Sequence, residues 1–219
     1  MSRSSSSSEI NYHMTALLLD GSERAAKTFL FAHGAGAPMD SPFMQRVAGG
    51  IAASGIRVIR FEFPYMHRQR ETGQRRVAPD PPRVLMQSFR ATIDQLGCCS
   101  KLVIGGKSLG GRIASMVADD AKVAGLVCLG YPFHPPGQPE KTRTKHLENL
   151  LTQTLILQGT RDSFGRPEDV AGYKLSPAVR IEWLEDGDHS FKPRIRSGRT
   201  EADNLGKAIG LIAEFIAAR

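Results

Sequence analysis

Short apolar runs alternate with longer amphipathic segments along most of the chain. The apolar runs have the length of strands and cover residues 16–19, 28–32, 56–63, 102–104, 123–129, 154–158 and 179–184. Between several of them, apolar residues recur every three or four positions, which predicts helices over residues 41–54, 82–96, 113–118 and 201–218. Strands that alternate with helices at these intervals predict an α/β fold, in which helices cover both faces of a mostly parallel sheet.

The remaining segments lack a long apolar period. Residues 146–151 and 167–175 have the length of short helices, whereas residues 66–82 form a polar, arginine-rich excursion to which the pattern assigns no element. The first twelve residues contain a run of five serines and offer almost nothing apolar to bury. We therefore expect residues 1–12 to form a disordered tail and residues 13–219 to form one domain.

Composition narrows the classes of function. The chain has 219 residues, of which 41% are hydrophobic and 23% charged, so it can bury a full core. It contains no apolar run of membrane-spanning length and no apolar N-terminal segment of the secretory kind, so we expect a cytoplasmic protein without membrane contact. The three cysteines, Cys98, Cys99 and Cys128, cannot form an extensive disulfide framework and lack metal-ligand spacing, so no metal or cofactor is expected.

One junction between a strand and a helix carries a recognisable motif. The apolar run that ends at Ile104 leads into Gly106-Lys107-Ser108-Leu109-Gly110, which fits the Gly-x-Ser-x-Gly turn of serine nucleophiles. Such a tight turn requires small residues two positions before and after the nucleophile, and the free N–H groups of the following helix can stabilise negative charge. Two other interpretations remain: a glycine-rich packing turn, and a phosphate loop, although Lys101 replaces the first glycine of that motif.

Three chemically suited residues follow three different predicted strands. They are Ser108, Asp162 and His189, and parallel sheets bind ligands beyond the carboxyl ends of their strands. A serine hydroxyl needs an imidazole to accept its proton, and the imidazole needs a carboxylate to fix its tautomer, so the order Ser, Asp, His predicts a catalytic triad. Asp186 and Asp188 compete with Asp162 for the role of the acid, but Asp188 adjoins His189, and adjacent side chains usually diverge.

Four motifs together resemble the α/β-hydrolase superfamily, and most closely the small predicted hydrolases akin to dienelactone hydrolase, including bacterial relatives of the testis-expressed protein 30 and KAT8 complex subunit 3 group. The motifs are Phe31-Ala32-His33-Gly34-Ala35-Gly36, Gly105-Gly106-Lys107-Ser108-Leu109-Gly110-Gly111, Gln158-Gly159-Thr160-Arg161-Asp162 and Gly187-Asp188-His189-Ser190-Phe191.

This resemblance implies an α/β-hydrolase fold and a carboxylesterase-like serine hydrolase that acts through an acyl-enzyme intermediate. Many α/β-hydrolases insert a large lid where this chain has only the stretch between Leu129 and Thr154, so we expect little or no lid. It also implies an oxyanion hole, formed by the backbone N–H of Leu109 and by that of Ala35 or, as a second choice, Gly36. We expect His33 to brace its own loop rather than to take part in catalysis.

Basic residues gather in three segments that leave the same predicted edge of the sheet. They are Arg68, Arg70, Arg75, Arg76 and Arg83, then Lys141, Arg143 and Lys145, and finally Lys192, Arg194, Arg196 and Arg199. The chain as a whole has a net charge of +7. This edge therefore either attracts a small anionic ester or another anionic partner, or it is an ordinary solvated surface.

A non-catalytic protein-interaction module on the same fold is the alternative function. We do not expect nucleic acid as a partner, and the sequence does not indicate an oligomeric state. The other histidines, His13, His67, His134 and His146, have no catalytic neighbours in the sequence and are expected at the surface.

Overall fold

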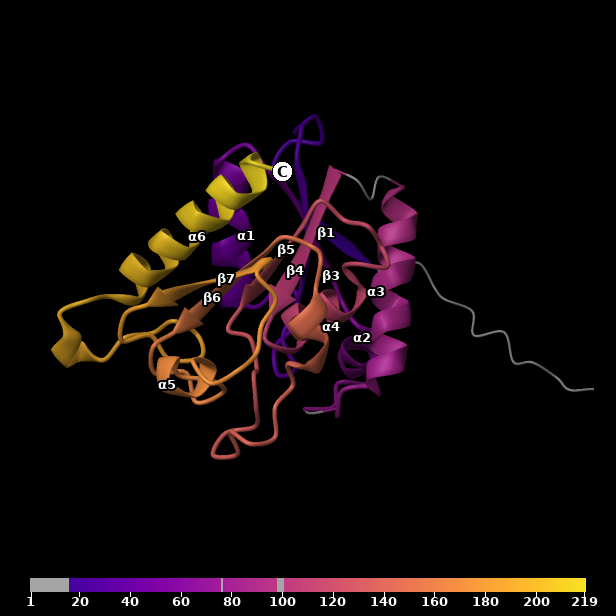
Figure 1. Cartoon of the computed structure of the whole chain (residues 1–219). Helices are drawn as coiled ribbons and strands as arrows, with labels where there is room; N and C mark the ends of the chain where they lie inside the picture. Colours follow the sequence, from indigo (N-terminus) through magenta and orange to yellow (C-terminus); the bar gives the residue numbers. More distant parts are fainter. Residues whose placement is uncertain (1–15, 76, 98–100) are drawn as a thin grey trace, which may run out of the picture.

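The computed structural model describes residues 16–75, 77–97 and 101–219. The residues named above that lie outside these ranges are the tail at residues 1–12, His13, Arg76, Cys98 and Cys99. Within the described ranges, seven strands form one sheet in the order β1-β3-β2-β4-β5-β6-β7 (Figure 1). The strands are β1 (Leu17–Asp20), β2 (Thr28–Ala32), β3 (Arg57–Phe61), β4 (Leu102–Lys107), β5 (Gly125–Leu129), β6 (Thr154–Gly159) and β7 (Val179–Leu184). Among them, β1 alone runs antiparallel to its neighbour, so the prediction of a mostly parallel sheet is confirmed.

Helices cover both faces of the sheet, as predicted. On one face, α1 (Pro42–Ala53) contacts α6 (Glu201–Ala217), and the opposite face carries α2 (Pro64–Thr72), α3 (Pro82–Leu96) and α4 (Leu109–Val117) (Figure 1). The shorter pieces are α5 (Pro167–Val170) and the 3-10 turns η2 (Lys145–Asn149) and η3 (Ile195–Ser197). The helix predicted over residues 167–175 is therefore shorter than expected, and the one predicted over residues 146–151 is a 3-10 turn.

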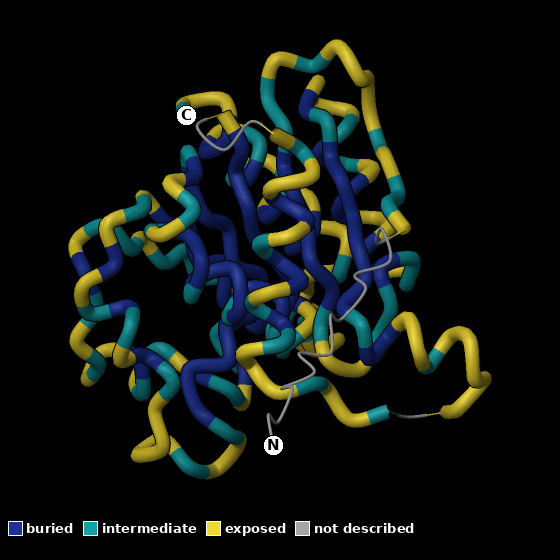
Figure 2. The backbone as a smooth tube through the Cα atoms, turned by 90° about the vertical axis from the view of Figure 1, so that its right-hand side faces the viewer, coloured by how far each residue is buried: buried dark blue, intermediate teal, exposed yellow. Residues whose placement is uncertain are grey.

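The alternation of side chains along the central strands supplies two apolar cores. In β4, Leu102 and Ile104 pack on the face that carries α3 and α4, whereas Val103 packs on the face of α1 and α6. Figure 2 shows the strands buried in the middle of the molecule and the exposed segments at its periphery. The sheet is thus buried on both faces, and its carboxyl edge is left for the loops that carry the candidate site.

The arginine-rich excursion differs from the prediction because it contains a helix. α2 begins at Pro64, which suits the first helical position, and it ends at Thr72, after which Gly73, with a φ of 65°, provides a left-handed cap. Only Tyr65 and Met66 of this helix are buried. A helix anchored by its first turn and polar thereafter has no apolar period that could reveal it in the sequence.

The prediction that two histidines are ordinary surface residues is wrong. His134 is only 2% exposed, and its Nε2 lies 3.3 Å from Oδ2 of Asp169. His146 is half-buried, with Nε2 2.8 Å from the Oγ of Ser115. Both partners lie more than thirty residues away in the chain, so local sequence could not reveal these contacts. His67 is exposed, as predicted.

The connection between β5 and β6 is too short to build a large lid. Residues 130–153 contain η2 as their one regular element, so the expectation of little or no lid is confirmed. In the described part of the chain, none of the helices combines the length and the apolar character needed to cross a membrane.

Gly105 allows β4 to lie close to its neighbours in the sheet. A methyl group at this position would overlap the carbonyl oxygen of Val127 on β5 and lie 3.0 Å from the ring of Phe29 on β2. Gly49 provides a contrast, since it is an exposed residue of α1 whose added methyl group would meet nothing within 4 Å.

Gly105→Ala should lower the free energy of unfolding by roughly 2–3 kcal/mol, because the backbone must move to accept the methyl group. Gly49→Ala should raise it by up to about 1 kcal/mol, because alanine loses less conformational entropy than glycine in a helix. Urea unfolding followed by circular dichroism measures both changes. A Gly105→Ala protein as stable as the wild type would contradict the close packing of β4.

Candidate active site

Ser108 occupies a tight turn between β4 and α4. Its φ of 50° and ψ of −112° lie in a region that residues other than glycine rarely adopt, and such backbone costs about 1–3 kcal/mol. A methyl group on Gly106 would collide with the backbone of Gly110, and one on Gly110 would lie 2.5 Å from the carbonyl oxygen of His33. The turn therefore needs glycine at both positions, as predicted, and it leaves Ser108 partly exposed at its tip.

Ser108, His189 and Asp162 form a chain of hydrogen bonds across three strand ends. The Oγ of Ser108 lies 2.9 Å from Nε2 of His189, and Nδ1 of His189 lies 2.8 Å from Oδ2 of Asp162. Because an ionised carboxylate can only accept, we assign the donated proton to Nδ1, which leaves a lone pair on Nε2 for the proton of Ser108. The fold thus brings the three predicted residues together in an arrangement suited to proton transfer.

The carboxylate of Asp162 is fully buried and is held by several donors. Gln158 Nε2 donates to Oδ2 at 2.9 Å, and the backbone N–H of Phe164 donates to Oδ1 at 2.9 Å. Gln158 is itself fixed, because the N–H of Tyr131 donates to its Oε1 at 2.7 Å. Together with His189, these donors compensate the buried charge. Sequence reasoning missed this role of Gln158, although a polar residue near the end of a buried apolar strand was a usable signal.

The two competing aspartates shape the loop that carries His189 and do not bond to its ring. Asp188 Oδ1 accepts from the backbone N–H of Ser190 at 2.8 Å, and Asp186 is engaged by arginines described below. The ring of His189 instead packs against that of Phe164, with centroids 4.4 Å apart. Of the three candidate acids, Asp162 is therefore the one whose carboxylate meets the imidazole.

His33 braces the loop after β2, as expected from the sequence. The residue is fully buried, its Nδ1–H donates to the carbonyl oxygen of Gly34 at 2.7 Å, and its Nε2 accepts from the N–H of Phe63 at 3.1 Å. Burial lowers the pKa of His33, which favours the neutral ring that this pair of bonds requires.

Tyr65, at the start of α2, fixes the same loop from the other side. Its hydroxyl lies 3.2 Å from the carbonyl oxygens of both Gly34 and Ala35. The loop also adjoins the nucleophile, since a methyl group on Gly34 would lie 3.7 Å from Cβ of Ser108. Ser108 therefore adjoins two backbone segments. One is the loop with the exposed residues Ala35 and Gly36, and the other is the first turn of α4, which begins at Leu109.

Carboxylates neutralise several of the basic residues at the carboxyl edge of the sheet. Arg70 lies 3.0 Å from Asp40 and 2.6 Å from Glu62, and Arg68 lies 2.5 Å from Asp80. The hydrogen bond from Arg70 holds the pKa of Asp40 below its ordinary value. The charge of this edge is thus smaller than the sequence suggests.

The rest of the basic edge keeps its charge. Within the described ranges, the residues of this set that form no ion pair are Arg75, Arg83, Lys141, Arg143, Lys192, Arg196 and Arg199. The described histidine, cysteine and carboxylate side chains do not gather in groups of three or more that could hold a metal ion.

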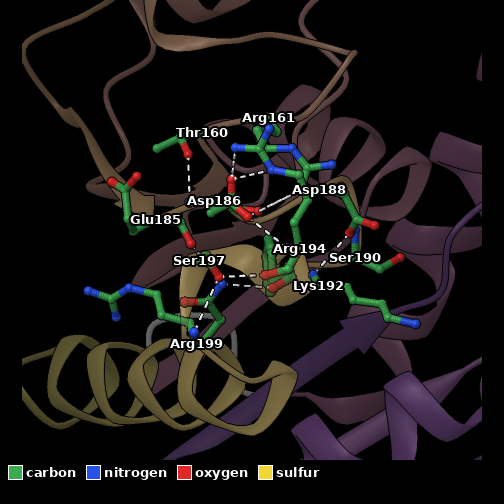
Figure 3. Close-up of polar contacts among 12 residues, drawn as sticks. Thr160, Arg161, Glu185, Asp186, Asp188, Ser190, Lys192, Arg194, Ser197 and Arg199 are labelled. Carbon is green, nitrogen blue, oxygen red and sulfur yellow. Dashed lines mark hydrogen bonds and ion pairs between the residues drawn. The ribbon is translucent and has the colours of Figure 1, made fainter.

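Asp186 ties the loop after β6 to the loop after β7. Its carboxylate accepts from the backbone N–H of Arg194 at 2.7 Å and from the Nε of Arg194 at 2.8 Å. Its backbone bonds to Thr160 and Arg161: the Asp186 N–H donates to the Thr160 Oγ1 at 2.8 Å, and its carbonyl oxygen accepts from Arg161 at 2.9 Å. Figure 3 shows Arg161 and Arg194 converging on Asp186 while Glu185 points away. Asp186 therefore connects the segment that carries Asp162 with the segment that carries His189.

The Arg194 hydrogen bonds lower the pKa of Asp186 to about 2. Because this pKa is depressed in the folded state, the stability that the carboxylate contributes is present above about pH 4 and is lost as the pH falls towards 2. Asp186→Asn should therefore unfold at a lower temperature than the wild type at pH 7, with a difference that shrinks by pH 2. Thermal unfolding from pH 2 to pH 7 measures this, with the exposed neighbour Glu185→Gln as control. A difference independent of pH would contradict the role of the ionised carboxylate.

Comparison with known proteins places this site in a family. The sequence model of the alpha/beta hydrolase domain matches residues 25–217. The fold is similar to that of a dienelactone hydrolase from Anabaena variabilis, with 20% identity and a TM-score of 0.73 over 95% of this chain and 94% of the other. It is also similar to an α/β serine hydrolase homologue from Coxiella burnetii (18% identity, TM-score 0.65, 90% and 89% covered). A third similar fold is that of a lidless α/β serine hydrolase from Xanthomonas campestris, with 18% identity and a TM-score of 0.63 over 88% of this chain and 85% of the other. With the family match spanning most of its length, the chain belongs to the alpha/beta hydrolases.

Proposed function

We propose that this protein is a serine hydrolase that cleaves esters through an acyl-enzyme intermediate. The observation that carries the proposal is the hydrogen-bond chain in which Ser108 Oγ lies 2.9 Å from His189 Nε2 and His189 Nδ1 lies 2.8 Å from Asp162. A hydroxyl is a weak nucleophile at neutral pH. In this geometry, the imidazole of His189 can accept the proton of the Ser108 hydroxyl, and the carboxylate of Asp162 can stabilise the charged imidazole that results.

In the first half of the reaction, His189 accepts the proton of Ser108 while Oγ attacks the carbonyl carbon of the ester. The carbonyl oxygen gains the negative charge, and we assign its stabilisation to the N–H of Leu109 and that of Ala35 or Gly36. Collapse of this intermediate expels the alcohol, which takes the proton from His189, and leaves the acyl group on Ser108. In the second half, His189 deprotonates a water that attacks the acyl carbon. His189 then returns this proton to the Oγ of Ser108 as the acid leaves, which restores both residues.

Two features support a small ester as the substrate. Ser108 is partly exposed, and residues 130–153 contain η2 as their one regular element, so short loops select the acyl group. The dienelactone hydrolase of similar fold acts, by its name, on a lactone, which is a cyclic ester.

A fluorophosphonate probe should label Ser108 covalently, because the probe reacts with serines whose proton a neighbouring base accepts. Mass spectrometry of the labelled protein should place the adduct on Ser108 and find none in Ser108→Ala. The buried Ser115, which also lies beside a histidine nitrogen at 2.8 Å, is a matched control, and Ser115→Ala should still be labelled at Ser108.

Hydrolysis of an activated ester should fall by several orders of magnitude in Ser108→Ala, and combining this change with His189→Gln should cost little more, because triad members act as a unit. A folded wild-type protein that neither takes the label nor hydrolyses esters would contradict the proposal and favour a non-catalytic interaction module.

We further propose that the site prefers anionic esters. Arg68, Arg70 and Arg194 are paired with carboxylates. The support for this preference therefore comes from Lys192 and Arg196 in the segment that follows His189, which are exposed and form no ion pair with the described residues, and from the net charge of +7 of the chain.

The ratio of kcat/KM for a carboxylate-bearing ester to that for a neutral ester of equal size should exceed one at low salt. It should decrease as salt rises, because the screening length is only about 8 Å near 0.15 M. Replacement of Lys192 and Arg196 by glutamine should lower the ratio at low salt and leave the neutral ester unaffected. Equal rates for both esters at every salt concentration would show that this edge is only a solvated surface.

A further inference from the structure

Lys107, the last residue of β4, buries its side chain directly before Ser108. The residue is 8% exposed, and its Nζ is shielded from solvent and has no hydrogen-bond partner among the described residues. The centroid of the Phe43 ring on α1 lies 5.7 Å from this nitrogen. Burial of an ammonium group without a hydrogen-bonded partner is unfavourable, so the packing of the fold does not by itself account for a lysine here.

The ammonium group lies beside the imidazole of His189. A methyl group on Gly130 would lie 2.9 Å from Nζ of Lys107 and 3.3 Å from Nδ1 of His189. Since both nitrogens lie this close to the same methyl position, the distance between Nζ of Lys107 and Nδ1 of His189 cannot exceed the sum of these two distances. Gly130, whose φ of 62° suits glycine, has no side chain to separate them. The side chain of Lys107 therefore extends to the ring of the proposed base.

The charged groups that act on this ammonium come from two other strand ends. They are the carboxylates of Asp162, after β6, and of Asp188, after β7, while α1 contributes the aromatic ring of Phe43. Burial lowers the pKa of Lys107 to about 8, although the two carboxylates oppose this effect. Lys107 therefore keeps its charge below pH 8, which includes the range in which imidazoles ordinarily titrate.

We propose that Lys107 is a positioning residue that acts through His189 and Asp162, because its buried charge favours the neutral imidazole and the ionised carboxylate from which proton abstraction starts. This inference rests on the proposed serine hydrolase function. A fixed positive charge this close to the ring of His189 opposes the uptake of a further proton by the pair formed by His189 and Asp162. Without that charge, the site takes up a proton at higher pH and loses its proton acceptor.

The test compares kcat/KM for a neutral activated ester as a function of pH in the wild type, Lys107→Met and Lys107→Arg. Methionine removes the charge at similar length, and arginine keeps the charge. Lys107→Met should move the acid limb of the profile to higher pH by about one pH unit. Lys107→Arg should leave the limb within a few tenths of a unit, as should Lys174→Met, which removes the charge of an exposed lysine.

An NMR titration of the His189 ring, assigned with His189→Gln, needs no turnover and so separates this inference from the proposed function. Its midpoint should also rise in Lys107→Met. Thermal unfolding checks that each variant is folded, and Lys107→Gln replaces Lys107→Met if the latter does not fold. A folded, uncharged variant whose acid limb and ring titration both coincide with the wild type overturns the role of Lys107. Absence of esterase activity in the wild type refutes the proposed function instead, and the ring titration then decides the inference alone.

Discussion

The hydrogen bond between the Asp162 carboxylate and Nδ1 of His189 joins the ends of β6 and β7, and the geometry of the site depends on it. At 2.8 Å, it fixes both the orientation of the imidazole and the nitrogen that carries the proton. A carboxylate with no exposed surface can stay ionised only if donors replace its water, and Gln158 and the N–H of Phe164 do so. The parallel sheet brings the segments of the site together, because β4, β5, β6 and β7 lie side by side and all end at one edge.

Two further charged residues, Asp186 and Lys107, lie near this bond. Asp186 lies outside the triad and is held ionised by Arg194, and there it connects the two loops whose relative position sets the bond between Asp162 and His189. Lys107 lies beside His189, buried and without a hydrogen-bond partner in the described part of the chain. The Asp186 carboxylate is compensated by hydrogen bonds from Arg194, whereas a buried ammonium without such bonds acts on its neighbours through a medium that screens it little. The two residues therefore act differently: Asp186 acts by holding the loops in place and Lys107 by its field.

The sequence was sufficient to predict the architecture and the three residues that the structure brings together at the candidate site. Ser108, Asp162 and His189 each follow an apolar run that proved to be a parallel strand, and the rule that such strands end at one edge was enough to group them. The polar helix α2 could not be predicted, since its apolar contact is confined to its first turn. The surroundings of Asp186 and Lys107 depend on contacts between separate loops, since Lys107 is surrounded by α1 and by the segments that follow β2 and β5. No local pattern in the sequence carries that information.

The central claim is that Ser108 carries the acyl group between two half-reactions. The most direct measurement is to mix the protein with an activated ester, quench the mixture in acid within the first turnover, and digest it with trypsin. Cleavage after Lys107 and Arg112 isolates residues 108–112, which contain Ser108 as their one serine. The account predicts that this peptide gains the mass of one acyl group and that the gain is absent in Ser108→Ala. Hydrolysis of the ester at the normal rate without any acyl group on this peptide would contradict it.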